Sequence, residues 1–418
     1  MNTTHSDEPI GGVVSTTNNI PGDMTITSRA YAVWRETRYS GIPIAQPEEK
    51  HYTFTLYDQP IGSSTYFDIR IKNAANRSKF IVGRVGGDAD TAALDISLKN
   101  EMECMDRVIC SVPRTGLNKH FAHFAQLAFP CWSALQRFPT GKRYMRSWVP
   151  PTSLGWNGEL VAAFEKAGIR ILGYDNKDPP GQDQQCQWEL EQSKAVSAWP
   201  VSPTLEKGTN GNLLLKPNHN DYKWRKNPVV YFSRQSEMAE LQHTILDSKY
   251  RPGVSNQTKI QLLILNRSGT RHFSNGETIA SSIKNSTLGD IIDVVHIQDM
   301  KGNLYEQALI MHSADIVISP HGAQLTNLAF IKPCTVVAEV FPRGYYLQFF
   351  QSYVVTAGGI SFEGYEDGRS PYFDLLGIED GKLRGPRRGG PIPLSAASVV
   401  RALPEFIIKF NTCRSNYM

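Results

Sequence analysis

The sequence predicts an α/β protein with a parallel sheet in its second half. Short runs of Val, Ile and Leu occur there and end in polar residues, glycine or proline, as buried strands do. Apolar residues recur at helical spacing between several of these runs. Such alternation builds a parallel sheet with helices on both faces. The 418 residues, of which 40% are hydrophobic, are enough for two or three domains.

The sequence of the first half predicts short strands, followed by units of one helix and one strand. Near its start, "HYTFTLYD" and "SKFIVGRV" favour strands joined by turns. "VICSV" is a short buried strand, and residues 119–137 have the apolar spacing of a helix despite Pro130. Residues 156–174 predict a helix, a stop at Gly168 and then a strand. The polar stretch 175–227 ends this half, and we expect the linker between two domains at its end.

The second half predicts five strands and several helices. Residues 304–313 form a helix between two of the strands. Near the C-terminus, "LSAASVVRALPEFIIKF" is an amphipathic helix with Ser395 as its N-cap and a kink at Pro404. The expected strands are "PVVYFSRQ", "QLLILNRSG", "DVVHIQ", "ADIVISPHG" and "CTVVAEVFP".

Composition argues against several classes of protein. The net charge of +4 and the absence of a long Lys/Arg run argue against a nucleic-acid or membrane surface. Six scattered cysteines without a Cys-x-x-Cys pair favour neither a zinc knuckle nor a disulfide framework. No run approaches the ~20 apolar residues of a transmembrane helix, and no signal peptide precedes the first strand. We expect a soluble chain, cytoplasmic as it stands, or lumenal in the Golgi or ER if it belongs to a longer anchored protein.

The stretch "ISPHGAQLTNLAF" predicts a ligand-binding turn. In open α/β sheets, ligands bind beyond the carboxyl ends of the strands. His321, Gly322 and Ala323 follow such a strand end, and a helix is expected to begin near Gln324 or Leu325. Because Gly322 and Ala323 have little or no side chain, backbone N–H groups can face a ligand there, helped by the positive end of the helix. The alternative is a tight turn with a capped helix and a structural histidine.

Further polar residues lie at the same expected edge. Thr326 and Asn327, in the first helical turn, can supply side-chain donors to a diphosphate. Glu339, near the end of the next apolar strand, would be costly in a core but could accept both hydroxyls of a ribose. Arg267 follows a buried strand and can bind phosphate oxygens bidentately. The alternatives are an edge ion-pair partner for the glutamate and ordinary surface ion pairs for the arginine.

Taken together, these elements resemble glycosyltransferase family 61. That family shows an Arg-x-x-x-Arg-x-x-x-Asn segment, a His-Gly-Ala-Gly-Leu-Thr-Asn motif, and a strand ending in Glu and a Pro. Order and spacing agree over residues 229–365, and Gln324 stands where the family has its second glycine. The resemblance implies that the matching residues, together with Gln324, bind the donor nucleotide. The matching residues are Arg267, Arg271, Asn275, His321, Gly322, Ala323, Leu325, Thr326, Asn327 and Glu339.

The resemblance implies a GT-B architecture, in which two Rossmann-like domains face each other across a cleft. Residues 1–225 would form the acceptor-side domain and residues 226–390 the nucleotide-sugar domain. Residues 391–418 would form a C-terminal helix, and packing of this helix on the first domain is one alternative. The implied reaction is an inverting transfer from a UDP-sugar to a hydroxyl of a glycan or glycoprotein. A pentose donor such as xylose is preferred over N-acetylglucosamine.

No cofactor and no metal are expected besides the donor. The second half has no Asp-x-Asp pair beside a strand end that would suit Mg²⁺ or Mn²⁺. The charge of the leaving group would then be met by Arg267, by the helix N-terminus and by His321.

The general base is expected on the helix of the first half. The family places Asn-x-x-His there, followed by an acidic residue. This sequence has His120 and His123, with Leu127 at the acidic position. His123 matches the family position, and His120 is the second candidate; a structural histidine is the alternative for either. Leu127 favours a rival hypothesis, a catalytically inactive nucleotide- or sugar-binding scaffold. An NAD-dependent enzyme is disfavoured because no GxGxxG follows an early strand.

Overall fold

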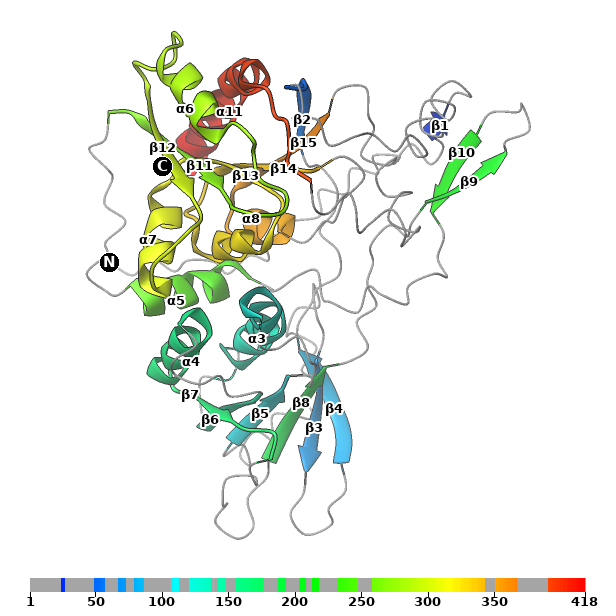
Figure 1. The fold of residues 1–418 in the computed structure, drawn as a ribbon. Helices are drawn as coiled ribbons and strands as arrows, with labels where there is room; N and C mark the ends of the chain where they lie inside the picture. Colours follow the sequence, from blue (N-terminus) through cyan, green and yellow to red (C-terminus); the bar gives the residue numbers. More distant parts are fainter. Residues whose placement is uncertain are drawn as a thin grey trace.

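The computed structural model of the chain has an α/β fold, as the sequence predicts (Figure 1). Within the described ranges it contains two six-stranded sheets and one three-stranded sheet. The residues that the structure describes are 24–26, 49–56, 67–72, 79–85, 107–112, 120–136, 138, 142–147, 155–175, 187–192, 203–207, 213–217, 232, 234–246, 258–342, 350–366 and 390–417.

The first six-stranded sheet belongs to the first half of the chain. Its strands β8, β5, β6 and β7 run parallel, while β3 and β4 add antiparallel pairs at one edge. Helices α3 (Phe121–Gln136) and α4 (Trp156–Lys166) pack on it. In sheet order the strands are β4 (Lys79–Val85), β3 (Phe67–Lys72), β8 (Gln187–Gln192), β5 (Arg107–Ser111), β6 (Lys142–Arg146) and β7 (Ile169–Leu172).

These elements confirm most expectations for the first half. The "VICSV" strand is β5, the helix over residues 119–137 is α3, and Pro130 lies inside it. Gly168 has φ 78° between α4 and β7, a left-handed conformation that glycine adopts without strain. The stretch 176–227, where the linker was expected, lies largely outside the described residues.

The second six-stranded sheet carries the motif segments. Five of its strands are parallel, and β2, from near the start of the chain, pairs antiparallel with β15. The expected strands "QLLILNRSG", "DVVHIQ", "ADIVISPHG" and "CTVVAEVFP" are all present, whereas most of "PVVYFSRQ" lies outside the described residues. In sheet order the strands are β12 (Ile292–Gln298), β11 (Ile260–Asn266), β13 (Ile316–Pro320), β14 (Val336–Val340), β15 (Ile360–Glu366) and β2 (Tyr52–Leu56).

Helices cover both faces of this second sheet, as expected of a parallel sheet. On one face lie α6 (Gly276–Lys284) and α11 (Ala396–Tyr417), and on the other α7 (Leu304–Ser313), α8 (Gln351–Thr356) and the 3₁₀ helix η3 (Ala323–Phe330) (Figure 1). All five residues of β14 are buried, because both of its faces are covered. Helix α7 has the predicted bounds.

The structure adds detail to two expectations about the helices. A helix does begin at the expected place after the His-Gly-Ala turn, and it is the 3₁₀ helix η3. The C-terminal helix packs on the second sheet, and there it also contacts β2, whose residues 52–56 belong to the range expected for the first domain. Its apolar stripe, including Val399 and Phe406, joins the core beneath α6, β2 and β14, so the second sheet supplies its partner. Ser395 does cap this helix, accepting a hydrogen bond from the backbone N–H of Ser398 at 3.1 Å.

The helices of the two halves share one hydrophobic core. Phe124 and Phe129 of α3 belong to the same buried cluster as Leu325 and Phe330 of η3. Helix α5 (Gln235–Leu246) lies between them, and Figure 1 shows α3 and α4 beneath it. The division into residues 1–225, 226–390 and 391–418 stays a prediction, and β2 lies in the sheet of the second half.

One disulfide lies in the core of each half, although the scattered cysteines were not expected to form a disulfide framework. Cys110 of β5 bonds Cys131 of α3, and Cys334 before β14 bonds Cys413 of α11. Tertiary packing brings together cysteines that are 21 and 79 residues apart in sequence. Among the described residues no cysteine is free.

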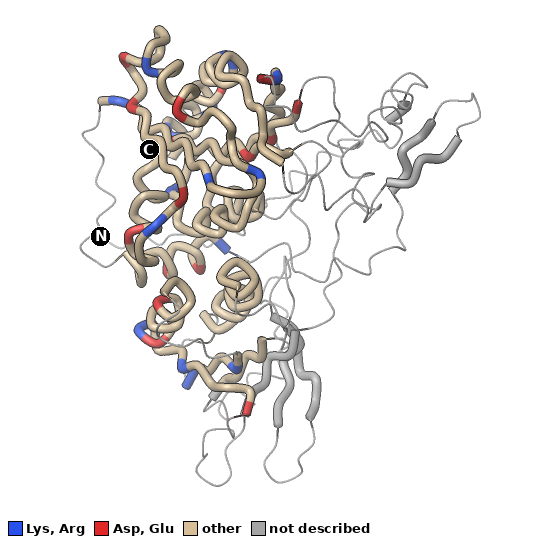
Figure 2. The backbone as a smooth tube through the Cα atoms, in the orientation of Figure 1, with Lys and Arg blue, Asp and Glu red and all other residues tan. Residues whose placement is uncertain are grey.

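The remaining separate sheet is small, and the charges are dispersed. It consists of β1 (Met24–Ile26), β10 (Leu213–Pro217) and β9 (Pro203–Lys207), all antiparallel. Along the described backbone, Lys and Arg positions are interspersed with Asp and Glu positions (Figure 2). Within the described part of the chain, no helix has the length and hydrophobicity needed to cross a bilayer.

Candidate functional site

The carboxyl ends of β11, β13 and β14 bring the two motif segments together. Arg267 directly follows β11, and His321 directly follows β13, the neighbouring parallel strand. A Cβ atom added at Gly322 would overlap Nη1 of Arg267, so the guanidinium lies against this glycine. Gly322 itself is extended, at φ 175°, and its lack of a side chain matters for this close approach alone. The structure thus places a fixed positive charge at the expected turn.

His321 is a buried residue that binds Glu339. Its Nδ1 lies 2.5 Å from Oε1 of Glu339, and only 4% of the histidine is exposed. Its backbone N–H donates to the carbonyl of Val340 at 2.9 Å, which ties the turn to β14. The rings of Phe341 and Phe350 lie 5.3 Å and 5.6 Å from the imidazole. The imidazole is therefore fixed by packing on its faces and by a hydrogen bond at one nitrogen.

Glu339 continues into a buried polar network. Nε2 of Gln351, in α8, donates to Oε2 of Glu339 at 2.8 Å and to Oε1 of Glu363 at 3.0 Å. The two glutamates are register partners on β14 and β15, so their side chains share one face of the sheet. The hydroxyl of Tyr365 donates to Oε2 of Glu363 at 2.5 Å. Two carboxyl groups thus lie side by side in the core.

This arrangement raises the pKa of Glu339 well above that of an ordinary glutamate. Burial is the largest cause, since the carboxylate loses its hydration, and the negative charge of Glu363 adds to it. The positive charge of Arg271 acts in the opposite direction. Glu339 therefore favours its protonated form.

Glu339 was expected to accept both hydroxyls of a ribose. Only 2% of it is exposed, and His321 and Gln351 occupy its two oxygens. A direct ribose contact would require one of these partners to leave. The expected contact stays a prediction, while the structure shows the carboxyl group acting on His321.

Arg271 and Asn275 shape the loop that follows β11. Arg271 is buried and has φ 55°, and its backbone N–H donates to the carbonyl of Gly390 at 3.1 Å. Asn275 donates through Nδ2 to Glu49 at 2.7 Å and to the carbonyl of Leu394 at 3.0 Å. In this structure the side-chain amide of Asn275 therefore anchors residues 390–395 instead of facing the His321 turn.

Asp299 anchors the start of the same loop. Asp299 accepts hydrogen bonds from the backbone N–H and the hydroxyl of Ser268, and these bonds lower the pKa of its carboxyl group. Because Ser268 is the residue after Arg267, Asp299 holds the backbone that presents the arginine.

The first residues of η3 differ in burial and in hydrogen bonding. Ala323 is half-buried, and Nε2 of Gln324 donates to Ser319 Oγ at 3.0 Å and to the carbonyl of Leu265 at 3.3 Å. The residue that departs from the family pattern thus folds back onto the ends of β11 and β13. Leu325 and Thr326 are fully buried, the leucine within the shared core.

Asn327 links the motif to the first half of the chain. Its Oδ1 accepts a 3.1 Å hydrogen bond from Nε1 of Trp156, the first residue of α4. Its Nδ2 donates to Gln307 at 3.0 Å and to the carbonyl of Gln324 at 3.1 Å. The asparagine therefore holds η3, α7 and α4 together.

The two candidate histidines lie at the end of α3 that adjoins this contact. The ring of Phe121 is 5.5 Å from that of Trp156, and the ring of His120 stacks on Phe121 at 5.3 Å. Helix α3 begins at Phe121, so His120 precedes it and is exposed, which corrects its expected place within the helix. The rings of His120 and His123 are 5.2 Å apart, and His123 Nδ1 lies 3.1 Å from Oε1 of Gln126.

Sequence reasoning missed Gln351, Glu363 and Tyr365. A signal was present for the latter two, because "ISFEGYE" places a glutamate and a tyrosine two residues apart in a strand, on one face. Gln351 gave no such signal. Leu127, at the family's acidic position, is half-buried and packs against the shared core.

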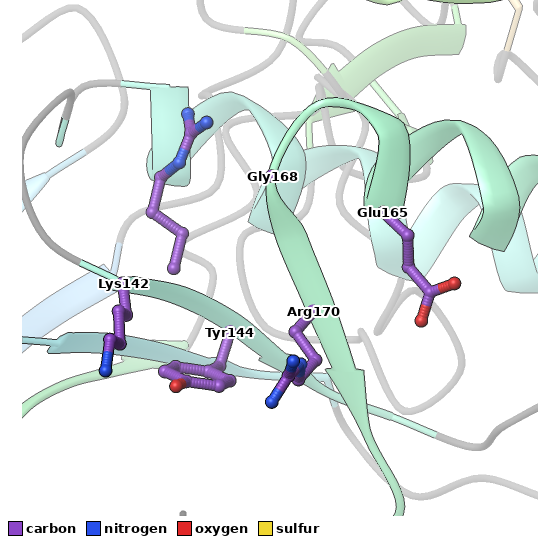
Figure 3. Close-up of a pocket in the computed structure, with 6 residues that line it drawn as sticks. Lys142, Tyr144, Glu165, Gly168 and Arg170 are labelled. Carbon is purple, nitrogen blue, oxygen red and sulfur yellow. The ribbon is translucent and has the colours of Figure 1, made fainter.

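A separate pocket lies on the first sheet and contains none of the expected site residues. Its volume is about 680 Å³, and it lies where β6, β7 and the end of α4 meet (Figure 3). Arg143 is held there by hydrogen bonds to the carbonyl of Ala167 at 2.5 Å and to Gln136 at 3.1 Å. Its lining consists of Lys142, Arg143, Tyr144, Glu165, Gly168 and Arg170.

Comparison with known proteins agrees with the motif residues. The family model described as Glycosyltransferase 61 matches residues 209–338, which include both arginines and the whole His321 motif. The chain is accordingly a glycosyltransferase. The match supports its membership in glycosyltransferase family 61 and confirms the resemblance seen in the sequence.

Other comparisons add little. No curated protein matches the chain. Among solved structures, a glycosyl transferase of family 9 from Veillonella parvula DSM 2008 matches at 9% identity, with a TM-score of 0.33. The match covers 74% of this chain and 99% of that one. A similarity this weak carries no argument about fold or function here.

Proposed function

We propose that the protein is an inverting glycosyltransferase that moves a sugar from a UDP-sugar to a hydroxyl of a glycan or glycoprotein. The observation that carries this proposal is the guanidinium of Arg267 lying against Gly322, beside the buried His321. A fixed cation and a polarised imidazole at the carboxyl end of a parallel sheet suit a nucleoside diphosphate. The matched family supports the same class of reaction.

The donor side would act through charge on the diphosphate. When the glycosidic bond breaks, negative charge develops on the β-phosphate of UDP. Arg267 and the Nε2 of His321 would meet that charge, and they are held in place before the reaction begins. We propose that no metal ion is required for this step.

The acceptor side would lie at the N-terminal end of α3. An inverting displacement needs a base that takes the proton of the acceptor hydroxyl. We propose His123 for this role, with His120 as the second candidate. Contacts from Phe121 through Trp156 to Asn327 connect this end of α3 to the donor motif, which supports a site formed by both halves. This arrangement is compatible with a GT-B architecture, which is part of the proposal.

The test is a binding and turnover experiment with a panel of nucleotide sugars. Calorimetry against UDP-xylose, UDP-arabinose and UDP-N-acetylglucosamine should show binding of at least one, with a pentose donor preferred. UDP release across a set of glycan acceptors should then show turnover. Binding of UDP without turnover on any acceptor would favour the inactive scaffold, and failure to bind any uridine nucleotide would contradict the proposal.

A further inference from the structure

The core behind His321 contains two carboxyl groups that share one amide. Nε2 of Gln351 lies within hydrogen-bond distance of both Glu339 and Glu363. A carboxylate oxygen can only accept, so this geometry assigns the NH₂ end of the amide to the side of the two glutamates. The Oε1 of Gln351 has no hydrogen-bond partner among the described residues. The amide thus fixes the orientation of both carboxyl groups.

The proton content of this network decides what His321 presents to a ligand. If one proton is shared between Glu339 Oε1 and His321 Nδ1, the histidine carries a second proton on Nε2 in either arrangement. The pair is then a carboxylic acid with a neutral imidazole, or a carboxylate with an imidazolium. If the shared proton is lost, Nδ1–H donates to the carboxylate and Nε2 becomes a bare acceptor. A bare acceptor would repel a phosphate oxygen.

We propose that Glu363, which Gln351 orients beside Glu339, is a positioning residue that keeps the His321–Glu339 pair protonated, so that His321 presents an N–H to the donor diphosphate. This inference rests on the proposed function and adds residues that act through His321. The described charged groups around the His321–Glu339 pair are Glu363 on β15, Arg271 in the loop after β11, and Arg267, which directly follows β11 and lies against Gly322 next to His321.

The charge balance explains the direction of the effect. Loss of the shared proton would leave a net negative charge on the pair, directly beside the negative charge of Glu363. That repulsion disfavours the loss and favours the protonated pair, while Arg271 opposes it in part. Tyr365 stabilises Glu363 as an anion by donating a hydrogen bond to it, which keeps the repelling charge in place.

The first experiment observes His321 in the free protein. Histidine-selective ¹⁵N NMR across pH reports which ring nitrogen is protonated, and the His321→Asn variant assigns the resonance. In the wild type, Nε2 should remain protonated to a higher pH than in Glu363→Gln. We expect the loss of this proton to shift down by about one pH unit or more, the order expected from removing a nearby like charge. Identical titrations in the two proteins would contradict the inference.

Two variants control this experiment. Glu366→Gln removes a carboxylate from the same strand, but from its opposite face, and should leave the His321 titration unchanged. Tyr365→Phe keeps the ring and removes only the hydrogen bond to Glu363, so it should shift the titration in the same direction by a smaller amount. It also carries the test if Glu363→Gln does not fold.

The second experiment follows UDP binding by calorimetry across pH. UDP affinity should fall with rising pH as His321 loses its Nε2 proton, and this fall should occur at lower pH in Glu363→Gln. Below the pH range in which His321 loses this proton, the wild type and Glu363→Gln should bind UDP equally. A uniform loss of affinity at every pH would show a merely structural role and overturn the inference. A wild type that binds no UDP would contradict the proposed function, whereas the NMR titration decides the inference by itself.

Discussion

The imidazole of His321 and the carboxyl group of Glu339 form a buried hydrogen bond of 2.5 Å between the ends of two neighbouring strands. The two residues are 18 positions apart in sequence and belong to separate segments of the motif. Their contact makes the turn after β13 and the end of β14 one structural unit. Any ligand that touches His321 is therefore affected by the charge on Glu339.

Removal of Arg267 should weaken binding of the donor nucleotide. Arg267→Ala should lose about 1.5–3 kcal/mol of UDP affinity, the range for a hydrogen bond to a charged group. Arg267→Lys should recover only part of this, because an ammonium cannot bind two oxygens side by side. Calorimetry with UDP measures both, and Arg401→Ala, an exposed site on α11, is the matched control. Unchanged affinity in a folded Arg267→Ala protein would exclude the arginine from the site.

Glu339 should make stability depend on pH. Its pKa in the folded protein is raised above its value in the unfolded chain, so the folded state holds the proton more tightly. The free energy of unfolding should therefore fall as pH rises above about 4.3, by up to about 1.4 kcal/mol per pH unit until the folded pKa is reached. Urea denaturation at several pH values measures the slope. Glu339→Gln should lack this component, and equal slopes in the two proteins would disprove the prediction.

His123 should affect turnover and not donor binding. If it is the general base, His123→Ala should lower kcat by about 10²–10⁴ with little change in UDP affinity. His120→Ala is the matched variant, since its ring is 5.2 Å away. Near-normal kcat in both variants would place the base elsewhere.

Metal chelation should leave the activity largely intact. The sequence motif segments offer arginine, histidine and amide groups, with no paired aspartates at a strand end of the second half. Steady-state rates before and after EDTA treatment test this directly. A complete loss of activity that Mn²⁺ restores would overturn both metal independence and the proposed GT-B architecture.

Each disulfide should stabilise the folded protein, and the bridge that encloses the longer segment of chain should stabilise it more. In the chain-entropy model, the bridge across 79 residues contributes about 4.5 kcal/mol and the bridge across 21 residues about 3 kcal/mol. Replacing both cysteines of a bridge with serine and measuring urea unfolding tests each value. The Cys334/Cys413 variant should be the less stable of the two. The reverse order would show that local packing outweighs chain entropy here.

Much of the fold follows from local sequence patterns. The bounds of α7 and the strands β11, β12, β13 and β14 of the second sheet were predictable, since apolar runs and helical spacing are properties of neighbouring residues. The motif residues Arg267 and His321 were also identifiable, because each follows a buried strand and the ends of parallel strands meet at one edge. These features follow from the order of neighbouring residues along the chain.

Other features depend on contacts between distant segments, which periodicity does not encode. Cys334 and Cys413 pair because α11 packs on the second sheet, and β2 completes that sheet from the other end of the chain. Gln351 gave no sequence signal, since its role exists only where α8 crosses two adjacent glutamates. The sequence by itself determined the strand and helix segments and the chemistry of the motif. Only the tertiary structure placed Glu339 behind His321, because burial and the charge of Glu363 arise from packing and not from residue order.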